Sequence, residues 1–286
     1  MRRYPELGSR TDLRQFSIQG GGAVATALIA LLEWEYECRL IAKVSDDPFG
    51  QLIRGSFDLP GFDTSGLVTQ PDRISPFAFV ALQEGHTMES ATFETLGSVS
   101  PLEPDELELG ALEGCATLLI DGSEPEAQLT AARRARELSI PVMLHLNRPN
   151  EALTELLPLT DVLIASERLT ADIAPQEDIE DALRAIRDQG PTVAVITMGL
   201  DGSIGITEDT IVRQPIYADI RPLERGGAGY LFYAGIVHGT LEGWPLRKRL
   251  QFASAAAGLS CRHIGTWAGV PSLQETEATA WSDERG

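Results

Sequence analysis

Residues 20–27 read GGGAVATA, and residues 227–235 read GAGYLFYAG. In both segments, small residues come directly before an apolar run that is typical of a helix. Glycine lets the backbone turn sharply, and the first amides of a helix point their N–H groups outward at its positive end. Each segment therefore predicts a tight turn that opens a helix and presents backbone amides to a ligand.

Short apolar strands alternate with helices through most of the remaining chain. Residues 39–44 form a predicted strand, and Asp46, Asp47 and Pro48 predict the start of a helix, with a carboxylate cap and a proline in the first turn. Further strands are expected at residues 117–121, 141–146, 161–165 and 192–197, and helices at residues 124–138, 179–187 and 241–261, the last broken at Gly243 and Pro245. This alternation predicts an α/β fold, a doubly wound and mostly parallel sheet with helices on both faces. The acidic tail after Gln274 is expected to fray.

Residues 76–97 interrupt that alternation. Two apolar runs at residues 77–82 and 92–96 flank a polar turn at residues 83–86, which is the pattern of a β-hairpin. A hairpin outside the alternating strands and helices predicts a small β lid beside the main sheet.

The charge balance excludes several classes of partner. The chain carries 42 acidic and 23 basic residues, a formal net charge of −19. Nucleic acids and anionic membranes need a basic surface, so neither is expected to bind. Because Lys43 and Lys248 are the only lysines, phosphate contacts would fall mainly to arginine side chains and backbone amides.

The remaining composition is that of a cytoplasmic protein. Cys38, Cys115 and Cys261 lie far apart without the spacing of metal ligands, which favours free thiols in a reducing compartment. No metal site is predicted. The longest apolar run, residues 23–32, is about half the length of a membrane span, and no apolar stretch follows Arg2 and Arg3 as in a signal peptide. We expect a soluble, cytoplasmic protein.

Two further segments occur in order with the first pair. Residues 41–50 read IAKVSDDPFG, with GFDT at residues 61–64, and residues 197–203 read TMGLDGS. Together with the two glycine segments, they resemble the signatures of the PfkB/ribokinase family of carbohydrate kinases, in the order and spacing of that family over about residues 4–273.

The resemblance implies a ribokinase-like architecture and a sugar-kinase reaction. A single domain over residues 1–286 is expected, with lid elements at about residues 4–19 and 76–97 and a homodimer formed through the lid. Family members transfer the γ-phosphoryl group of ATP to a hydroxymethyl group of a sugar, a nucleoside or a similar small alcohol. The implied ligand is therefore a small-molecule sugar or nucleotide, with ATP and Mg²⁺ as cofactors if the protein is active.

The resemblance also assigns roles to individual residues. The anion hole and nucleotide site would comprise Arg225, Gly227, Ala228, Gly229, Thr197, Gly199 and Gly202. The substrate site would include Gly21, Gly22, Lys43 and Asp46. Amides at the start of the helix after Gly227, together with its dipole, would face the migrating phosphoryl group. A tight helix entry that needs small residues for packing is the alternative explanation of the same turn.

Tyr230 occupies the position of the family's catalytic aspartate. In the family, this aspartate directly follows the Gly-Ala-Gly turn and takes the proton of the acceptor hydroxyl. A tyrosine has a reference pKa near 10, which makes it a poor base at neutral pH, and loss of a positioned base costs roughly 10²–10⁴ in rate. The bulk of Tyr230 would also fill space near the acceptor. The nearest carboxylate, Glu224, aligns where the family often has aspartate and is a possible substitute.

Three other positions depart from the family pattern. Ala25 stands where a sugar-binding asparagine is expected, His145 where aspartate is usual, and Leu169 at the carboxylate position of the element that organises magnesium. The sequence also begins at about the linker that follows the family's first strand, so this strand and its substrate-binding carboxylate are expected to be missing or to lie upstream of Met1.

Three hypotheses therefore follow for the function. The first is a ribokinase-like protein with lost or much reduced phosphoryl transfer that acts as a ligand-binding or partner protein. The second is an active ATP-dependent sugar or nucleoside kinase with a non-standard base, for which Glu224 is the candidate. The third is a structural or assembly subunit that uses the lid as its contact surface.

Overall fold

The computed structural model describes residues 4–83, 90–148, 151–208 and 210–282. The polypeptide forms two compact units. The first unit comprises Met1–Pro101, Ala218–Leu231 and Ala256–Thr276, and the second comprises Leu102–Tyr217, Phe232–Ala255 and Glu277–Gly286.

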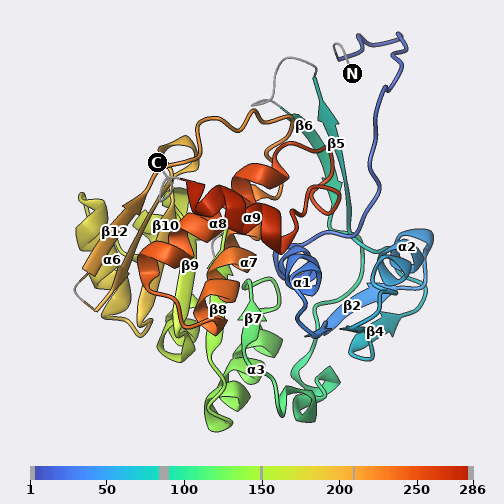
Figure 1. Cartoon of the computed structure of the whole chain (residues 1–286). Helices are drawn as coiled ribbons and strands as arrows, with labels where there is room; N and C mark the ends of the chain where they lie inside the picture. Colours follow the sequence, from blue (N-terminus) through green and yellow to red (C-terminus); the bar gives the residue numbers. More distant parts are fainter. Residues whose placement is uncertain (1–3, 84–89, 149–150, 209, 283–286) are drawn as a thin grey trace. The chain divides into compact units, whose positions relative to one another are not determined.

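A six-stranded sheet forms the centre of the second unit, in the order β12-β11-β10-β9-β8-β7. Strands β7 to β10 run parallel, whereas β10, β11 and β12 pair antiparallel, as the neighbouring arrows in Figure 1 show. The strands are β7 (Leu118–Ile120), β8 (Val142–Leu146), β9 (Val162–Ser166), β10 (Val193–Thr197), β11 (Ser203–Thr207) and β12 (Thr210–Gln214). The predicted mostly parallel sheet is therefore present, with an antiparallel extension at one edge.

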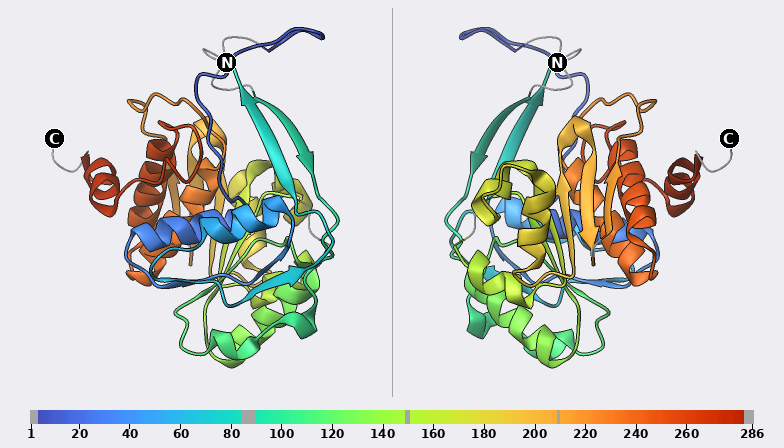
Figure 2. Two further views of the ribbon diagram at one scale, coloured as in Figure 1. Left: turned by 90° about the vertical axis from the view of Figure 1, so that its right-hand side faces the viewer. Right: turned by 90° about the vertical axis from the view of Figure 1, so that its left-hand side faces the viewer.

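Helices cover both faces of this sheet. Figure 2 shows the green to olive helices α3 to α6 on one face, and the orange residues 232–241 of α7 and 246–255 of α8 on the other. The bounds are α3 (Pro125–Glu137), α4 (Leu153–Leu156), α5 (Thr170–Ile173), α6 (Ile179–Arg187), α7 (Ala228–Leu241) and α8 (Leu246–Ser260). Single 3₁₀ turns lie at η1 (Pro104–Glu106), η2 (Leu109–Leu112), η3 (Leu157–Leu159), η4 (Glu167–Leu169) and η5 (Gly199–Asp201).

The core of the second unit explains why its strands are continuous apolar runs. Strand β8 is buried along its whole length, because helices pack on both faces of a parallel sheet. Helix α6 turns Ala182, Leu183 and Ile186 to the sheet, and Asp178 caps its first turn by accepting from the N–H groups of Glu180 and Asp181. Burial of these side chains, at roughly 25 cal/mol per Å² of apolar surface, is the main stabilisation of the sheet.

In its described N-terminal part, the first unit contains helices α1 and α2 and three two-stranded sheets. Strands β1 and β3, and strands β2 and β4, pair parallel, whereas β5 and β6 form an antiparallel hairpin. The bounds are α1 (Ala23–Glu33), β1 (Cys38–Arg39), β2 (Ala42–Ser45), α2 (Pro48–Ser56), β3 (Phe62–Asp63), β4 (Leu67–Gln70), β5 (Phe77–Leu82) and β6 (Ser90–Thr95). The paired strands are at the predicted position, whereas His86 and the rest of residues 84–89 lie outside the described residues.

The base of the hairpin is fastened to the loop before α2. Asp47 caps α2 by accepting from Gly50 N–H at 2.8 Å, and its other oxygen accepts from Ser75 N–H at 3.2 Å. Asp46 accepts from Asp72 N–H at 3.0 Å. The predicted helix start at Asp46, Asp47 and Pro48 is therefore correct, and the same two carboxylates also hold the chain that leads into β5.

The C-terminal segment differs from the expectation. Helix α9 spans Leu273–Ala280, where a frayed acidic tail was expected. The helix is ordered because its polar sequence still buries Thr276 and Ala280. The Ser272 carbonyl also accepts from both the backbone N–H and the hydroxyl of Thr276.

Among the described residues, none of the helices combines the length and the apolar character that a membrane crossing requires.

Candidate functional site

The predicted anion-binding turn lies at the start of α7, in the first unit. Gly227 has a φ of +78°, a conformation that glycine adopts without steric cost. A Cβ at Gly227 would also overlap the side chain of Thr266, so glycine is required there for two reasons. Helix α7 begins at the next residue, Ala228, and Tyr230 N–H already donates to Gly227 C=O at 2.9 Å. The turn therefore lies at the N-terminal end of a 14-residue helix, which is the positive end of its dipole.

Glu224 is bound to the neighbouring loop. Its Oε2 accepts from Gly265 N–H at 2.8 Å, and its own backbone N–H donates to Cys261 C=O at 3.1 Å. The carboxylate is half-buried in this position. Its hydrogen bond fixes the loop that precedes the turn, which is a structural use of the group proposed as a substitute base.

Arg225 and Tyr230 flank the glycines, and both are half-buried. Arg225 C=O accepts from Ala228 N–H at 3.3 Å, which closes the turn ahead of α7. Tyr230 lies in the first helical turn, directly after Gly229. The residue that follows the glycines is therefore held on a regular helix.

The glycine segment of α1 lies in the same unit. Gly21 and Gly22 are exposed, and Gly22 caps α1 with a φ of +97° and accepts from Thr26 N–H at 3.0 Å. Ala25 is buried, so this position contributes a methyl group to the core. The exposed backbone at Gly21 and Gly22 is the part of the segment that a ligand could approach.

Lys43 and Asp46 both form hydrogen bonds within the first unit. The Lys43 ammonium donates to Ser100 Oγ at 3.0 Å and to Pro101 C=O at 3.4 Å. Asp46 accepts from Asp72 N–H and from the Ser45 hydroxyl. Apart from the contact with Ser45, these contacts join chain segments that lie 26 to 58 residues apart, so both side chains have structural roles that sequence patterns do not indicate.

The predicted nucleotide residues lie in the second unit, at the carboxyl end of β10. Thr197 ends the strand and donates through Oγ1 to Ala165 C=O at 3.4 Å. Gly199 and Gly202 have φ values of +61° and +85°, and Met198 N–H donates to Gly202 C=O at 2.8 Å to close a tight turn. Ligands of open α/β sheets bind beyond the carboxyl ends of the strands, and this turn lies at that edge.

His145 and Tyr233 form a buried pair in the second unit that sequence patterns did not reveal. Their rings stack with centroids 5.2 Å apart, and the Tyr233 hydroxyl donates to Met143 C=O at 2.6 Å. Burial lowers the pKa of His145 to about 4, against the opposing effect of Asp121. Burial likewise raises the pKa of Tyr233 well above its usual value. Both side chains are therefore neutral at pH 7, and His145 provides no positive charge for a phosphate.

The element aligned with magnesium binding lacks a suitable set of ligands. Leu169 is buried, Glu167 is exposed, and Ser166 ends β9. Within the described parts of the chain, no cluster of three or more His, Cys, Asp or Glu side chains is arranged to hold a metal ion. A hard cation prefers carboxylate oxygens, which a buried leucine cannot supply, so these residues do not fit Mg²⁺.

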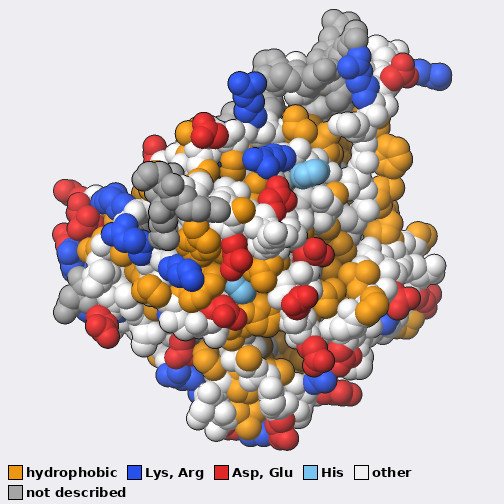
Figure 3. All heavy atoms as spheres, in the orientation of Figure 1, with side chains coloured by type: hydrophobic (Ala, Val, Ile, Leu, Met, Phe, Trp, Pro, Cys, Tyr) orange, Lys and Arg blue, Asp and Glu red, His pale blue; other side chains and the backbone are white. Residues whose placement is uncertain are grey.

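Charges of both signs lie on the surface of the protein. Figure 3 shows red acidic side chains spread among blue basic ones on the face in view. With a net charge of −19, the molecule as a whole repels anions, so phosphate binding would depend on backbone amides and Arg225.

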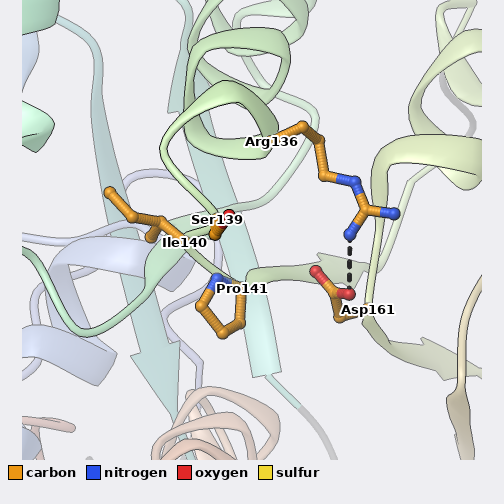
Figure 4. A pocket seen from close by; sticks show the side chains of 5 residues that line it. All are labelled: Arg136, Ser139, Ile140, Pro141 and Asp161. Carbon is orange, nitrogen blue, oxygen red and sulfur yellow. Dashed lines mark hydrogen bonds and ion pairs between the residues drawn. The ribbon is translucent and has the colours of Figure 1, made fainter.

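A shallow hollow of about 450 Å³ lies elsewhere in the second unit, lined by Arg136, Ser139, Ile140, Pro141 and Asp161. Figure 4 shows the Arg136 guanidinium pointing at Asp161, at an N–O distance of 2.8 Å. Pro141 and Asp161 directly precede β8 and β9. The hollow is therefore at the amino-terminal edge of the strands, opposite the edge that binds ligands in such sheets, and its charges neutralise each other.

Comparison with known proteins finds its relatives among carbohydrate kinases. A family model described as pfkB family carbohydrate kinase matches residues 3–273. A nucleoside kinase of Methanothermobacter thermautotrophicus is 23% identical over 95% of the chain and 88% of its own length. A ribokinase of Arabidopsis thaliana, solved with ribose and ATP, superposes with a TM-score of 0.81 at 20% identity, covering 98% of this chain and 93% of its own. A structure from E. coli with ATP and Mg²⁺ has a TM-score of 0.82 at 20% identity, covering 96% and 94%. At such identities the solved structures confirm the ribokinase-like fold alone.

Proposed function

The chain belongs to the PfkB family of carbohydrate kinases, and from this premise we propose that its own ATP-dependent phosphoryl transfer to a sugar is lost or much reduced. The protein would then act by binding a nucleotide or sugar, or as a partner of another protein. The observation that carries the proposal is the combination of Tyr230 after the glycine turn with a Glu224 carboxylate that is already bound to Gly265 N–H at 2.8 Å.

Neither side chain is suited to act as a general base. A tyrosine hydroxyl has a reference pKa near 10, so almost none of it is ionised at neutral pH. Glu224 already accepts from Gly265 N–H through Oε2, which holds the carboxylate against the loop at Gly265. Because a positioned base contributes roughly 10²–10⁴ to the rate, its loss alone would reduce turnover to a small fraction of that of an ordinary kinase.

The turn at residues 227–229 supports retained phosphate binding. Its amides and the helix dipole of α7 favour an anion, and Arg225 can add charge-assisted hydrogen bonds. In relatives that use ATP and Mg²⁺, the nucleotide supplies the phosphoryl group and the cation neutralises charge on it. The residues at Ser166–Leu169 do not fit that cation, which supports binding without efficient transfer.

Thermal denaturation with added ligands tests the binding part of the proposal. A ligand that binds only the folded state raises the melting temperature. At a ligand concentration 100 times the dissociation constant, it adds about 2.7 kcal/mol to the free energy of unfolding. We expect stabilisation by ATP, ADP or tripolyphosphate, and loss of this effect in Gly227→Ala, where a side chain would displace the turn. An unchanged melting temperature with every nucleotide and every sugar would refute the binding role.

We also propose that the lid elements, residues 4–19 and 76–97, form a homodimer contact. Large apolar side chains are exposed on the hairpin, with Phe79 at 52% and Phe93 at 65%, and their rings face one another across the strand pair at 6.4 Å. Tyr4 bridges the same pair, because its hydroxyl donates to Ala81 C=O at 2.9 Å and accepts from Ala91 N–H at 3.0 Å.

The mass in solution tests this contact. Exposed apolar patches of this kind usually mark an interaction surface. We expect a dimer for the intact protein and a monomer for Phe93→Glu. A monomeric intact protein would contradict the proposal.

The free cysteines, Cys38, Cys115 and Cys261, favour a reducing, cytoplasmic setting for the protein.

A further inference from the structure

Three consecutive residues of the first unit, Gly265, Thr266 and Trp267, contact two separate parts of the candidate site. We call them the 265–267 bridge. On one side the bridge touches the phosphate-binding turn, and on the other it touches the glycine segment at the start of α1. Each contact is a hydrogen bond or a close packing contact between described residues.

The contacts with the turn come from the first two residues of the bridge. Gly265 N–H donates to Glu224 Oε2 at 2.8 Å, and the Thr266 hydroxyl donates to Gly226 C=O at 3.2 Å. The Thr266 side chain also occupies the space where a Cβ of Gly227 would lie. The turn is therefore packed directly against the bridge and cannot shift toward it.

The contacts with the glycine segment come from Trp267. Its backbone N–H donates to Gln19 Oε1 at 3.1 Å, and its indole N–H donates to Thr26 Oγ1 at 3.1 Å. The ring lies against Gly20, where a Cβ would overlap it. On its other side the ring packs on Phe57, with centroids 5.0 Å apart. Trp267 therefore holds Gln19 through its backbone N–H and Thr26 through its indole N–H, on either side of the three glycines.

We propose that the 265–267 bridge positions the phosphate-binding turn by tying it to the glycine segment, with Thr266 and Trp267 as the positioning residues. Close-packed groups transmit displacements because no free volume absorbs them. A change at either end of the bridge therefore alters the other end, and binding of phosphate at the turn is coupled to the order of residues 19–26. The phosphate part of this inference rests on the proposed function; the mechanical link does not.

Hydrogen–deuterium exchange of the ligand-free protein tests the link. Trp267→Phe keeps a ring beside Gly20 but removes the indole donor to Thr26. We expect faster exchange both in residues 19–26 and in residues 226–230. Trp34→Phe is the matched control, since it loses an equivalent indole hydrogen bond, to Pro271 C=O at 3.0 Å in the same unit, without touching the turn. Faster exchange confined to residues 19–26 in Trp267→Phe, or equal effects in Trp34→Phe, would overturn the inference.

Affinity for tripolyphosphate separates positioning from mere stability. Thr266→Val removes the hydroxyl donor and keeps the shape, and loss of one such hydrogen bond predicts about five-fold weaker binding. Thr266→Ser keeps the donor and should retain the wild-type affinity. Trp34→Phe should lower the melting temperature and leave the affinity unchanged.

The outcomes distinguish the two proposals. If the wild type binds tripolyphosphate and both Thr266→Val and Trp267→Phe bind it equally well, the bridge has no positioning role and the proposed function stands. If the wild type does not bind tripolyphosphate, the phosphate-binding role fails, while the exchange experiment still decides whether the bridge links the two segments.

Discussion

Glu224 is the residue at which an impaired and an active kinase make opposite predictions. In the structure its Oε2 accepts from Gly265 N–H, so its role there is that of an acceptor. A glutamine can accept the same hydrogen bond through its amide oxygen, but it cannot take a proton from a substrate. We therefore expect Glu224→Gln to leave any residual phosphoryl transfer within about two-fold of the wild type, far less than the loss of a positioned base would cause. Abolished transfer in this variant would establish Glu224 as the base.

Glu224→Ala tests how much the hydrogen bond with Gly265 contributes to the stability of the fold. The substitution leaves Gly265 N–H without this acceptor, and a part-buried hydrogen bond of this kind contributes about 0.5–1.5 kcal/mol. We expect a lower melting temperature for Glu224→Ala than for Glu224→Gln. Equal melting temperatures would show that the hydrogen bond contributes little to the loop.

His145 gives a prediction for the pH dependence of stability. Burial lowers its pKa from 6.5 to about 4. Below pH 6.5 the unfolded chain binds a proton that the folded protein does not bind until about pH 4, so the free energy of unfolding falls as the pH drops through this window. From pH 7 to pH 5, this histidine alone accounts for a loss of about 2 kcal/mol.

Urea unfolding at the two pH values measures this effect. In His145→Leu the loss between pH 7 and pH 5 should be smaller than in the wild type by about this amount. His238, whose pKa burial also lowers, is present in both proteins and cancels in the comparison. An identical pH dependence in wild type and His145→Leu would contradict the assignment.

At the scale of elements, Asp47 joins helix α2 to the base of the β5–β6 hairpin. One oxygen caps the helix at Gly50 N–H and the other accepts from Ser75 N–H. Removal of a helix cap weakens the start of the helix, and here it also releases the chain that enters β5. We expect Asp47→Ala to raise the exchange rate of the amides of both Gly50 and Ser75, whereas Asp47→Asn should preserve much of the protection. Faster exchange at Gly50 alone would separate the cap from the hairpin.

Elements of the parallel sheet could be predicted from the sequence, whereas several others could not. Strands β8, β9 and β10 are short apolar runs, because helices cover both of their faces. Strand β11 contains Ser203 and Gly205 and follows a tight glycine turn, so its sequence resembles a loop. Helix α9 is mostly polar and is ordered by a few buried contacts, which a composition-based expectation of fraying misses.

The candidate site was only partly predictable for a related reason. The turn at Gly227 was found because a positive φ followed by a helix leaves a glycine pattern in the sequence. The partners of Lys43, Asp46 and Trp267 are distant in sequence, up to 248 residues away for Trp267, so no local pattern indicates them. Whether Thr197, Gly199 and Gly202 contact a nucleotide stays a prediction.

For the molecule as a whole, family membership and activity are separate questions. The match over residues 3–273 assigns the chain to the PfkB carbohydrate kinases. Catalysis depends on a few side chains, and a fold can persist after those side chains have changed. By the family resemblance, Tyr230, Ala25 and Leu169 stand at three such positions, and they support the proposed loss of transfer together with the bound Glu224 carboxylate.

The most direct test is the rate of phosphoryl transfer from ATP by the intact protein, measured against a panel of sugars and nucleosides with Mg²⁺ present. Kinases typically turn over at about 1–100 s⁻¹. Our account predicts rates well below about 1 s⁻¹ with every acceptor, while ATP or tripolyphosphate still raises the melting temperature. Turnover within the ordinary range for any acceptor on the panel would contradict it.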